Sequence, residues 1–370
     1  MEWVKLGDIA EIRKGKKVDQ CEGGINAVRY IQIEDLRHND EMKFTCEPKA
    51  VMANGEDVLI AWDGANAGTV SFDLEGAIGS TISKISIKES KKKKLLPQYL
   101  GIFLQYKEDY LRQTTTGATI PHINKQALVQ LAVPLFTLEI QNRIIELNNN
   151  LGSIIAKRRE QIDALDALVG SLFLEISEQV EGALVHFKTV ASIETNIVND
   201  FASFSDEYYL GVEDIEKKTG KILKQVKVRD AKIKSNKNRF TRGTILYSKI
   251  RPNLNKVALP DFDGLVSTDV FPIKCGDKIN KYYLLHEMRS EKFVIYATLN
   301  SSGANIPRVN RKTVENYTFK LPPIDLQNRF ADYVTSIEAQ KESLRASLSE
   351  LETLFDALMQ AAFSGHLNQS

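Results

Sequence analysis

The sequence contains few of the residues that usually carry metal or redox chemistry. It has three cysteines, Cys21, Cys46 and Cys275, in no CxxC spacing, and five histidines, none at the spacing of metal ligands. We therefore expect reduced thiols, no disulfide, no zinc site and a cytoplasmic protein. No apolar run approaches the roughly 18 residues of a membrane span. The start, Met1–Lys5, also lacks the layout of a signal peptide.

Catalytic motifs are also missing. There is no GxxxxGK[ST] phosphate loop, no HExxH and no [DNS]PP[YFW] methyltransferase box, although Leu321–Ile324 resembles the middle of that box. Gly64–Gly68 lacks the strand–turn–helix setting of a dinucleotide site. Glu213–Lys218 is similar to a nuclease metal site, but its counterpart Glu34–Leu36 lacks the downstream Glu and Lys. We interpret that pair as scaffold, and we expect a chain that is not an enzyme and holds no metal or cofactor itself.

The charge is balanced overall but segregated along the chain. Of 370 residues, 49 are Lys or Arg and 48 are Asp or Glu, and 43% are hydrophobic, enough for sizeable cores. Residues 217–256 hold fourteen basic residues and one acid, whereas 139–181 hold four basic residues and eight acids. A basic stretch interleaved with Phe240 and Tyr247 is typical of nucleic-acid binding. A merely solvated surface is the competing interpretation.

The chain repeats itself at an offset of 186 residues. Thr116–Lys125 (TGATIPHINK) aligns with Ser302–Arg311 (SGANIPRVNR). Without a gap, the same offset aligns Gln141-Asn142-Arg143 with Gln327-Asn328-Arg329 and then three leucines of each half. A chance match would not keep one register over such a length, so the sequence indicates a tandem duplication.

The leading part of each half predicts a mixed α/β globule. Short β-branched or alternating runs bounded by turn residues predict strands. In the first half these runs are 29–35, 57–62 and 81–87, and in the second half 208–212, 243–248 and 264–271. One helix is expected in each globule, over 97–112 and 280–297, before the shared Gly-Ala-x-Ile-Pro turn.

The trailing part of each half predicts a long coiled-coil helix. Apolar positions follow a 4-3 spacing over more than four heptads, which is the seam of a coiled coil. The principal seam residues are Leu151, Ile155, Arg158, Ile162, Leu165 and Leu172 in the first helix, and Ile337, Lys341, Leu344, Leu348, Leu351 and Leu358 in the second. The seam of each helix carries one basic residue, Arg158 or Lys341, which we expect at the same position of the seam. These residues either extend outward past the seam or fix its register.

These patterns divide the chain into globule, helix, globule and helix. The expected segments are 1–137, 138–182, 183–323 and 324–370. Two long helices of one chain most simply pair with each other in antiparallel orientation. We therefore expect a dumbbell with pseudo-two-fold symmetry.

These residues resemble the DNA-specificity subunit of type I restriction-modification systems. The resemblance rests on three features. The opening segment Val4–Ala10 has a degenerate copy in Phe187–Ile193. The motif Gly-Ala-x-Ile-Pro-x-[Ile/Val]-Asn occurs twice and is followed by the similar segments 137–143 and 323–329, and the four segments follow the order globule, helix, globule, helix. It covers nearly the whole chain. One departure is that the first copy has Phe136-Thr137 where the second has Pro322-Pro323.

The resemblance implies two target-recognition domains that read the halves of a split, asymmetric site in double-stranded DNA. It also implies long helices that set the distance between the halves and dock two modification subunits. Those partners would carry S-adenosylmethionine and methylate adenine, and restriction subunits would use ATP and Mg²⁺.

Candidate DNA contacts are side chains that reach base edges or phosphates from loops. The second globule offers Lys249, Arg251, Asn253, Asn255 and Lys256, the phosphate candidates Lys234, Lys237, Arg239 and Arg242, and the turn residues Ser301, Asn305 and Arg308. The first globule offers Trp62, Asn66 and Thr115, although Trp62 suits packing better. Gly117 and Gly303 suggest positive φ in the repeated turn.

Three other functions stay open at this point. A recognition subunit of a system that cuts on both sides of its site would share this layout. A self-sufficient methyltransferase or nuclease would need a cofactor or metal motif. A coiled-coil scaffold would be indifferent to DNA.

Overall fold

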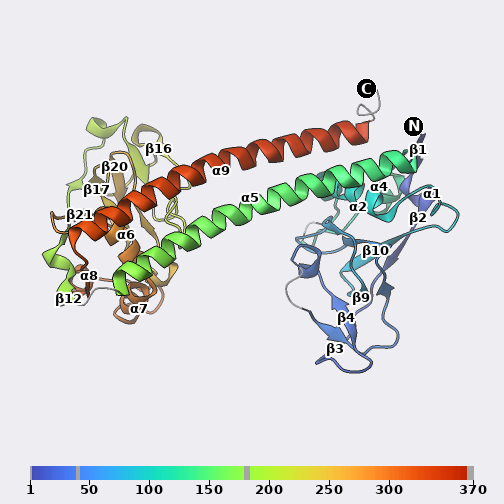
Figure 1. The fold of residues 1–370 in the computed structure, drawn as a ribbon, viewed down its shortest axis with the longest axis horizontal. Helices are drawn as coiled ribbons and strands as arrows, with labels where there is room; N and C mark the ends of the chain where they lie inside the picture. The colour runs from blue at the N-terminus through green and yellow to red at the C-terminus, as the bar shows by residue number, and fades with distance from the viewer. Residues whose placement is uncertain (1, 39–41, 118, 179–183, 365–370) are drawn as a thin grey trace. The chain divides into compact units, whose positions relative to one another are not determined.

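The computed structural model describes residues 2–38, 42–117, 119–178 and 184–364. It contains two compact units, of which unit 1 comprises residues 1–159 and 346–370 and unit 2 comprises residues 160–345 (Figure 1). Each unit combines one α/β globule with parts of both long helices. This division differs from the four segments expected above, whose boundary at 182 and last six residues lie outside the described residues.

Unit 1 is built on short sheets. Its strands are β1 (Glu2–Lys5), β2 (Ala10–Lys14), β3 (Gln20–Cys21), β4 (Val28–Ile31), β5 (Phe44–Thr45), β6 (Met52–Ala53), β7 (Val58–Ala61), β8 (Val70–Ser71), β9 (Gly76–Ile78), β10 (Ile82–Ile87) and β11 (Ala132–Leu135). They form the sheets β1-β11, β2-β10-β7-β8 and β3-β5-β4-β9-β6. Its short helices are α1 (Leu6–Ile9), α2 (Pro97–Tyr106), α3 (Glu108–Gln113) and α4 (Lys125–Gln130).

Unit 2 has the same plan. Its strands are β12 (Leu184–His186), β13 (Ala191–Ile193), β14 (Ile197–Val198), β15 (Tyr208–Leu210), β16 (Val226–Lys227), β17 (Lys237–Phe240), β18 (Ile245–Ser248), β19 (Val257–Ala258), β20 (Gly264–Ser267), β21 (Val270–Cys275) and β22 (Thr318–Lys320). They form β12-β22, β13-β21-β18-β19 and β14-β17-β20-β15-β16. Its helices are α6 (Lys281–Arg289), α7 (Glu291–Leu299) and α8 (Arg311–Asn316).

The topology confirms the duplication. The order β2-β10-β7-β8 recurs as β13-β21-β18-β19, and the parallel pair β4–β9 recurs as β15–β20. The larger sheets differ at an edge, where β3 lies beside β5 in unit 1 and β14 lies beside β17 in unit 2. The predicted mixed α/β class is therefore correct.

Three details of the predicted elements are wrong. Strand 29–35 ends at Ile31, because Asp35 Oδ2 accepts the Gln32 N–H (2.6 Å) and starts a 3₁₀ turn over Glu34–Leu36. Each expected globular helix is two helices, broken at Lys107 and at Ser290, where the Ser290 Oγ caps α7. The strand expected over 264–271 is divided between β20 and β21 by a turn at 268–269.

The expectation of three free thiols is also wrong. Pairing of β3 with β5 brings Cys21 within a Cα–Cα distance of 6.3 Å of Cys46, and the two form a disulfide. The two cysteines are 25 residues apart in the sequence, so no local motif indicated that they pair. Cys275 is free and half-buried. Among the described residues, no helix is both long enough and apolar enough to cross a membrane.

Two 41-residue helices, α5 (Leu138–Glu178) and α9 (Ile324–Ser364), run through both units. In unit 1 the start of α5 and the end of α9 share one apolar core, and in unit 2 the end of α5 and the start of α9 share another. The helices therefore pair antiparallel, as expected. All twelve principal seam residues are buried or half-buried, in keeping with the 3.5-residue spacing.

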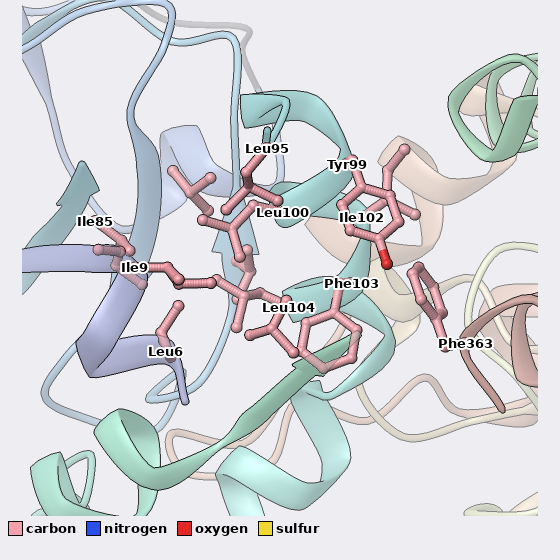
Figure 2. Packing of buried hydrophobic residues seen from close by; sticks show 14 of the residues in the cluster. Leu6, Ile9, Ile85, Leu95, Tyr99, Leu100, Ile102, Phe103, Leu104 and Phe363 are labelled. Carbon is pink, nitrogen blue, oxygen red and sulfur yellow. The ribbon is translucent and has the colours of Figure 1, made fainter. Parts of the chain in front are cut away.

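Aromatic side chains fix the end of α9 in the core of unit 1. Phe363 contacts Tyr99 and Phe103 of α2, with ring centroids 5.8 and 5.2 Å apart (Figure 2). The Tyr99 hydroxyl donates to the Pro134 carbonyl (2.6 Å), so its polar end is satisfied inside the core.

The expectation that the two basic residues share one seam position is wrong. At the 186-residue offset Lys341 aligns with Ile155, whereas Arg158 aligns with Leu344. Lys341 is 3% exposed, and its Nζ contacts Asp166 of the opposing helix and Glu338 (2.7 Å). Extension past the seam is therefore wrong for Lys341, because carboxylates cover its amine. In unit 1 a more exposed pair, Arg159–Glu352 (2.6 Å), links the same two helices.

A buried glutamine attaches each long helix to its globule. Gln141 accepts the Leu96 N–H at Oε1 (2.9 Å) and donates from Nε2 to the carbonyls of Lys94 and Phe136 (both 2.8 Å). Gln327 repeats the arrangement with the Asn280 N–H (2.8 Å) and two carbonyls. Both glutamines are fully buried. The repeated Gln-Asn-Arg motif thus has a structural cause.

Replacing Gln141 with Glu is expected to destabilise the protein by about 2–4 kcal/mol, because a carboxylate cannot donate to the two carbonyls. Urea unfolding at pH 7.5 measures this change. The neighbouring exposed residue supplies a matched control, since Asn142→Asp makes the same amide-to-acid change outside the core. Equal midpoints for the two variants would contradict the anchoring role.

His286 lies among aromatic rings in unit 2. Its ring centroid is 5.2 Å from that of Phe330 and 6.0 Å from that of Phe173. Burial, and then the charges of Arg289 and Lys341, lower the pKa of His286 to about 3. The folded state therefore holds a neutral imidazole at neutral pH.

Acidification is expected to weaken the folded state through His286. Between pH 6.5 and 3 the unfolded chain protonates this histidine and the folded chain does not, so stability falls as the pH falls. The free energy of unfolding of the wild type should fall between pH 7.5 and pH 5.0, and the fall should be about 1–2 kcal/mol smaller in His286→Leu. Urea titrations at both pH values measure this, and exposed His186→Gln is the control. The same pH response in all three proteins would refute the assignment.

Candidate nucleic-acid interface

The loop between β18 and β19 of unit 2 carries the strongest candidates. A 3₁₀ turn over Pro252–Leu254 is flanked by two left-handed residues, Arg251 (φ 49°, ψ 63°) and Asn255 (φ 49°, ψ 55°). The Ser248 N–H donates to the Lys256 carbonyl (3.0 Å) and closes the loop. Arg251 and Asn253 are exposed at its surface.

The structure brings the repeated turn of unit 2 against this loop. The Arg251 N–H donates to the Pro307 carbonyl (2.8 Å), and the Val309 N–H donates to the Lys249 carbonyl (2.8 Å). Ser302 and Arg308 exchange two backbone hydrogen bonds within the turn (2.9 and 2.8 Å). Residues 249–256 and 301–308 thus form one surface, which we call the loop–turn surface of unit 2.

Asp269, in the turn between β20 and β21, partly neutralises this surface. Its Oδ1 lies 3.5 Å from Lys249 Nζ and 3.8 Å from Arg308 Nη2. Lys249 also lies over the Phe271 ring, 5.7 Å from the centroid. Sequence reasoning missed Asp269, because only the tertiary fold brings this turn to the loop.

The remaining candidates on this surface differ in whether their side chains are hydrogen-bonded within the fold. Asn255 Nδ2 donates to the Arg289 carbonyl and Lys256 Nζ to the Val212 carbonyl (both 2.8 Å), so these two support the loop. The Ser301 hydroxyl donates to the Thr298 carbonyl (2.7 Å). Asn305 is exposed.

The four candidates between 234 and 242 lie in two environments. Lys234 and Arg242 have exposed side chains. Lys237 is buried, its Nζ donates to the Ser235 carbonyl and hydroxyl (2.7 and 2.8 Å), and burial lowers its pKa. Arg239 pairs with Glu207 (2.9 Å) and lies over the Phe204 ring. Lys237 and Arg239 therefore have roles within the fold.

Unit 1 has a loop–turn surface of the same construction. The Gly64 N–H donates to the Pro121 carbonyl and the Ile123 N–H to the Trp62 carbonyl (both 2.9 Å). Trp62 packs on the core, in agreement with the expectation that it suits packing better than a DNA contact. Asn66 is half-buried. The Thr115 hydroxyl donates to the Arg112 carbonyl (2.8 Å). Gly117 and Gly303 have φ of 98° and 108°, as the repeated turn suggested.

Sequence reasoning missed the polar group at the centre of the unit 1 surface. Asp63 contacts Lys14 Nζ and His122 Nδ1, both at 2.6 Å. Burial acts to raise the pKa of Asp63, but the hydrogen bonds from Lys14 and His122 outweigh it and lower that pKa. His122 aligns with Arg308 in the repeated motif, and this alignment could have identified it.

A second set of cations lies over aromatic rings in unit 2. Lys227 Nζ is 4.2 Å from the centroid of Tyr208, and Lys237 Nζ is 5.5 Å from that of Tyr209. The strands β15, β16 and β17 present these residues. Lys227 and Tyr208 are half-buried and reach the surface of this sheet, whereas Lys237 is buried and supports the fold.

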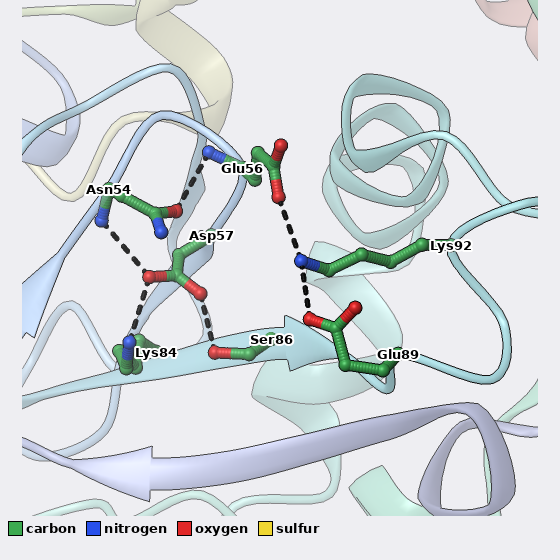
Figure 3. Close-up of polar contacts among 7 residues, drawn as sticks. All are labelled: Asn54, Glu56, Asp57, Lys84, Ser86, Glu89 and Lys92. Carbon is green, nitrogen blue, oxygen red and sulfur yellow. Dashed lines mark hydrogen bonds and ion pairs between the residues drawn. The ribbon is translucent and has the colours of Figure 1, made fainter.

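Two other polar groups are structural. Asp57 accepts hydrogen bonds from Lys84 (2.9 Å), Ser86 and the Asn54 N–H (3.0 Å), and Lys92 bridges Glu56 and Glu89 (Figure 3). These residues line a cavity of about 210 Å³ but satisfy one another.

The carboxylates that resembled a nuclease site also support the backbone. Asp214 Oδ2 accepts the Gly211 N–H (2.7 Å), as Asp35 Oδ2 accepts the Gln32 N–H. The scaffold interpretation is therefore supported. In the described part of the chain, no three His, Cys, Asp or Glu side chains gather in a group able to hold a metal ion.

Two tandem α/β units with matched loop–turn surfaces and two shared long helices define a duplicated recognition protein. The sequence matches the family described as type I restriction modification DNA specificity domain over residues 1–164 and 195–353. It is 25% identical over 398 residues to the type I restriction enzyme MjaVIII specificity subunit of Methanocaldococcus jannaschii, covering 99% of this chain and 92% of that protein. It is 27% identical over 293 residues to the EcoDI specificity subunit of Escherichia coli, covering 68% and 66%.

Solved structures share the fold. One comes from a study of complex assembly and conformational transition of the type I R-M system, with a TM-score of 0.59, 16% identity and coverage of 98% of this chain and 97% of that chain. The S subunit from M. genitalium has a TM-score of 0.54, 14% identity and coverage of 98% and 96%. The chain belongs to the type I restriction-modification DNA specificity family.

Proposed function

We propose that this chain recognises a bipartite, asymmetric DNA site, with one half-site read by each unit. The observation that carries the proposal is the recurrence of one loop–turn construction with different side chains. Unit 1 presents Asp63, Asn66 and His122, whereas unit 2 presents Arg251, Asn253 and Arg308. A shared backbone with different hydrogen-bonding groups suits two half-sites of different sequence.

The proposal assigns the chemistry to partner subunits. Two modification subunits with S-adenosylmethionine would methylate adenine, and restriction subunits would use ATP and Mg²⁺. Exposed apolar residues on the long helices support docking there. Leu168 of α5 and its repeat counterpart Leu354 of α9 are 46% and 47% exposed, and Leu174 is 51% exposed. These leucines offer apolar contacts to the protein partners that the proposal places on the long helices.

Methylome sequencing of the source organism with and without this gene tests the function. Deletion is expected to abolish one split, adenine-methylated motif. Replacing residues 183–323 with the corresponding segment of a relative should then change one half of the motif only. A motif that persists after deletion, although the modification subunits are expressed, would contradict the proposal.

Lys234 and Arg242 are expected to contact phosphates. Alanine at either position should weaken binding to all DNA sequences alike, because phosphate contacts carry no base information. The slope of log affinity against log salt concentration should fall by about one unit for each variant. Titration of labelled DNA with the assembled complex measures this slope. Lys93→Ala, an exposed lysine in a unit 1 turn, is the control, and a changed sequence preference would contradict the assignment.

A further inference from the structure

The loops after β7 and β18 share two backbone hydrogen bonds and have positive φ at equivalent positions. In unit 1 the Ala61 N–H donates to the Thr69 carbonyl (2.8 Å), and in unit 2 Ser248 and Lys256 make the matching bond (3.0 Å). Inside each loop, the Ala67 N–H donates to the Gly64 carbonyl (3.0 Å) and the Leu254 N–H to the Arg251 carbonyl (2.9 Å). These bonds pair residues 64–68 with 251–255 one by one.

The paired loops place different residues at their left-handed positions. Unit 1 has glycine at both, Gly64 (φ 93°) and Gly68 (φ 96°). Unit 2 has Arg251 and Asn255 at the equivalent positions. Asn255 has a local reason to be there, since asparagine tolerates this conformation and its Nδ2 bonds the Arg289 carbonyl.

Arg251 has no such local reason. A left-handed backbone is unfavourable for a residue with a Cβ, and a following proline makes helical conformations still less favourable. Within the part of the chain that the structure describes, its guanidinium makes no hydrogen bond or ion pair. Strained residues held by their surroundings concentrate at functional sites. Here the surroundings are Pro252 and the Pro307 carbonyl bonded to the Arg251 N–H.

The charge around Arg251 favours a role for this residue in particular. Asp269 lies near both Lys249 and Arg308 and partly neutralises them, whereas no carboxylate of the described residues forms an ion pair with exposed Arg251. A backbone held in one conformation suits a hydrogen bond to a base edge, because such a bond depends on the direction of the donor. A planar guanidinium donates two parallel hydrogen bonds to the O6 and N7 of guanine in the major groove.

We propose that Arg251 is a specificity-determining residue that reads a guanine in the half-site of unit 2. The equivalent Gly64 leaves unit 1 without this contact. The inference rests on the proposed function, and it names the residue that reads the half-site and the base that this residue reads.

Binding selection from randomised DNA, with the chain assembled with its modification subunits, tests the inference. The wild type should select guanine at one position. Arg251→Gly should lose that preference and bind the preferred site about tenfold to hundredfold more weakly, with other positions unchanged. Arg251→Lys should retain part of the affinity but lose the discrimination, because an ammonium has no planar fork.

A gain-of-contact variant provides an independent test. A Cβ added at Gly64 meets open space, although the φ of 93° strains any side chain there, so Gly64→Arg is expected to fold with a lower thermal midpoint and to add a guanine preference to the other half-site. The thermal midpoint of Arg251→Gly should stay near that of the wild type, because relief of strain and the greater freedom of unfolded glycine oppose each other.

The outcomes are distinguishable. An equal loss of affinity for all sequences in Arg251→Gly, with a lower salt slope, would show a phosphate contact and overturn the inference. Unchanged affinity and preference would also overturn it. A wild-type complex without any sequence preference would instead refute the proposed function.

Discussion

Buried hydrogen bonds of Gln141 and Gln327 hold each long helix to its globule. Each uses one acceptor and two donor bonds to join the first turn of a long helix to backbone groups of its globule. Because both glutamine side chains are fully buried, another orientation of the helix would leave their polar atoms unsatisfied. A heptad seam can slide or rotate at small cost, but a three-bond anchor holds one orientation. The direction in which each long helix leaves its globule is therefore fixed by hydrogen bonds as well as by apolar packing.

Duplication lets the same scaffold carry two different surfaces. The sheet order, the parallel strand pair and the loop–turn hydrogen bonds recur in both units, so the backbone is shared. The side chains on it are not, since unit 1 has Asp63 bonded to Lys14 and His122 where unit 2 has Asp269 between Lys249 and Arg308. The side chains at these matched positions differ between the two units without disturbing either core, because they lie outside it.

Much of the fold could be predicted, and part of the site. The duplication, the helix seam and most strands were predicted from patterns that repeat at fixed intervals, and the structure confirms these predictions. The break of each globular helix, at Lys107 and at Ser290, depends on the backbone conformation of one residue, which no periodicity reports. Among the phosphate candidates, charge alone could not separate exposed Lys234 from buried Lys237, because burial depends on Tyr209 and Ser235 around it.

The order of the residues was enough to predict a tandem repeat of an α/β globule and a heptad helix, because repetition and periodicity are visible along the chain. Which loops meet depends instead on how the chain folds in three dimensions. Residues 251 and 307, or 64 and 121, are joined by hydrogen bonds across more than 50 positions, and no local pattern encodes such contacts. The same holds for the Cys21–Cys46 disulfide and for the left-handed backbone of Arg251, which its surroundings impose against its own preference.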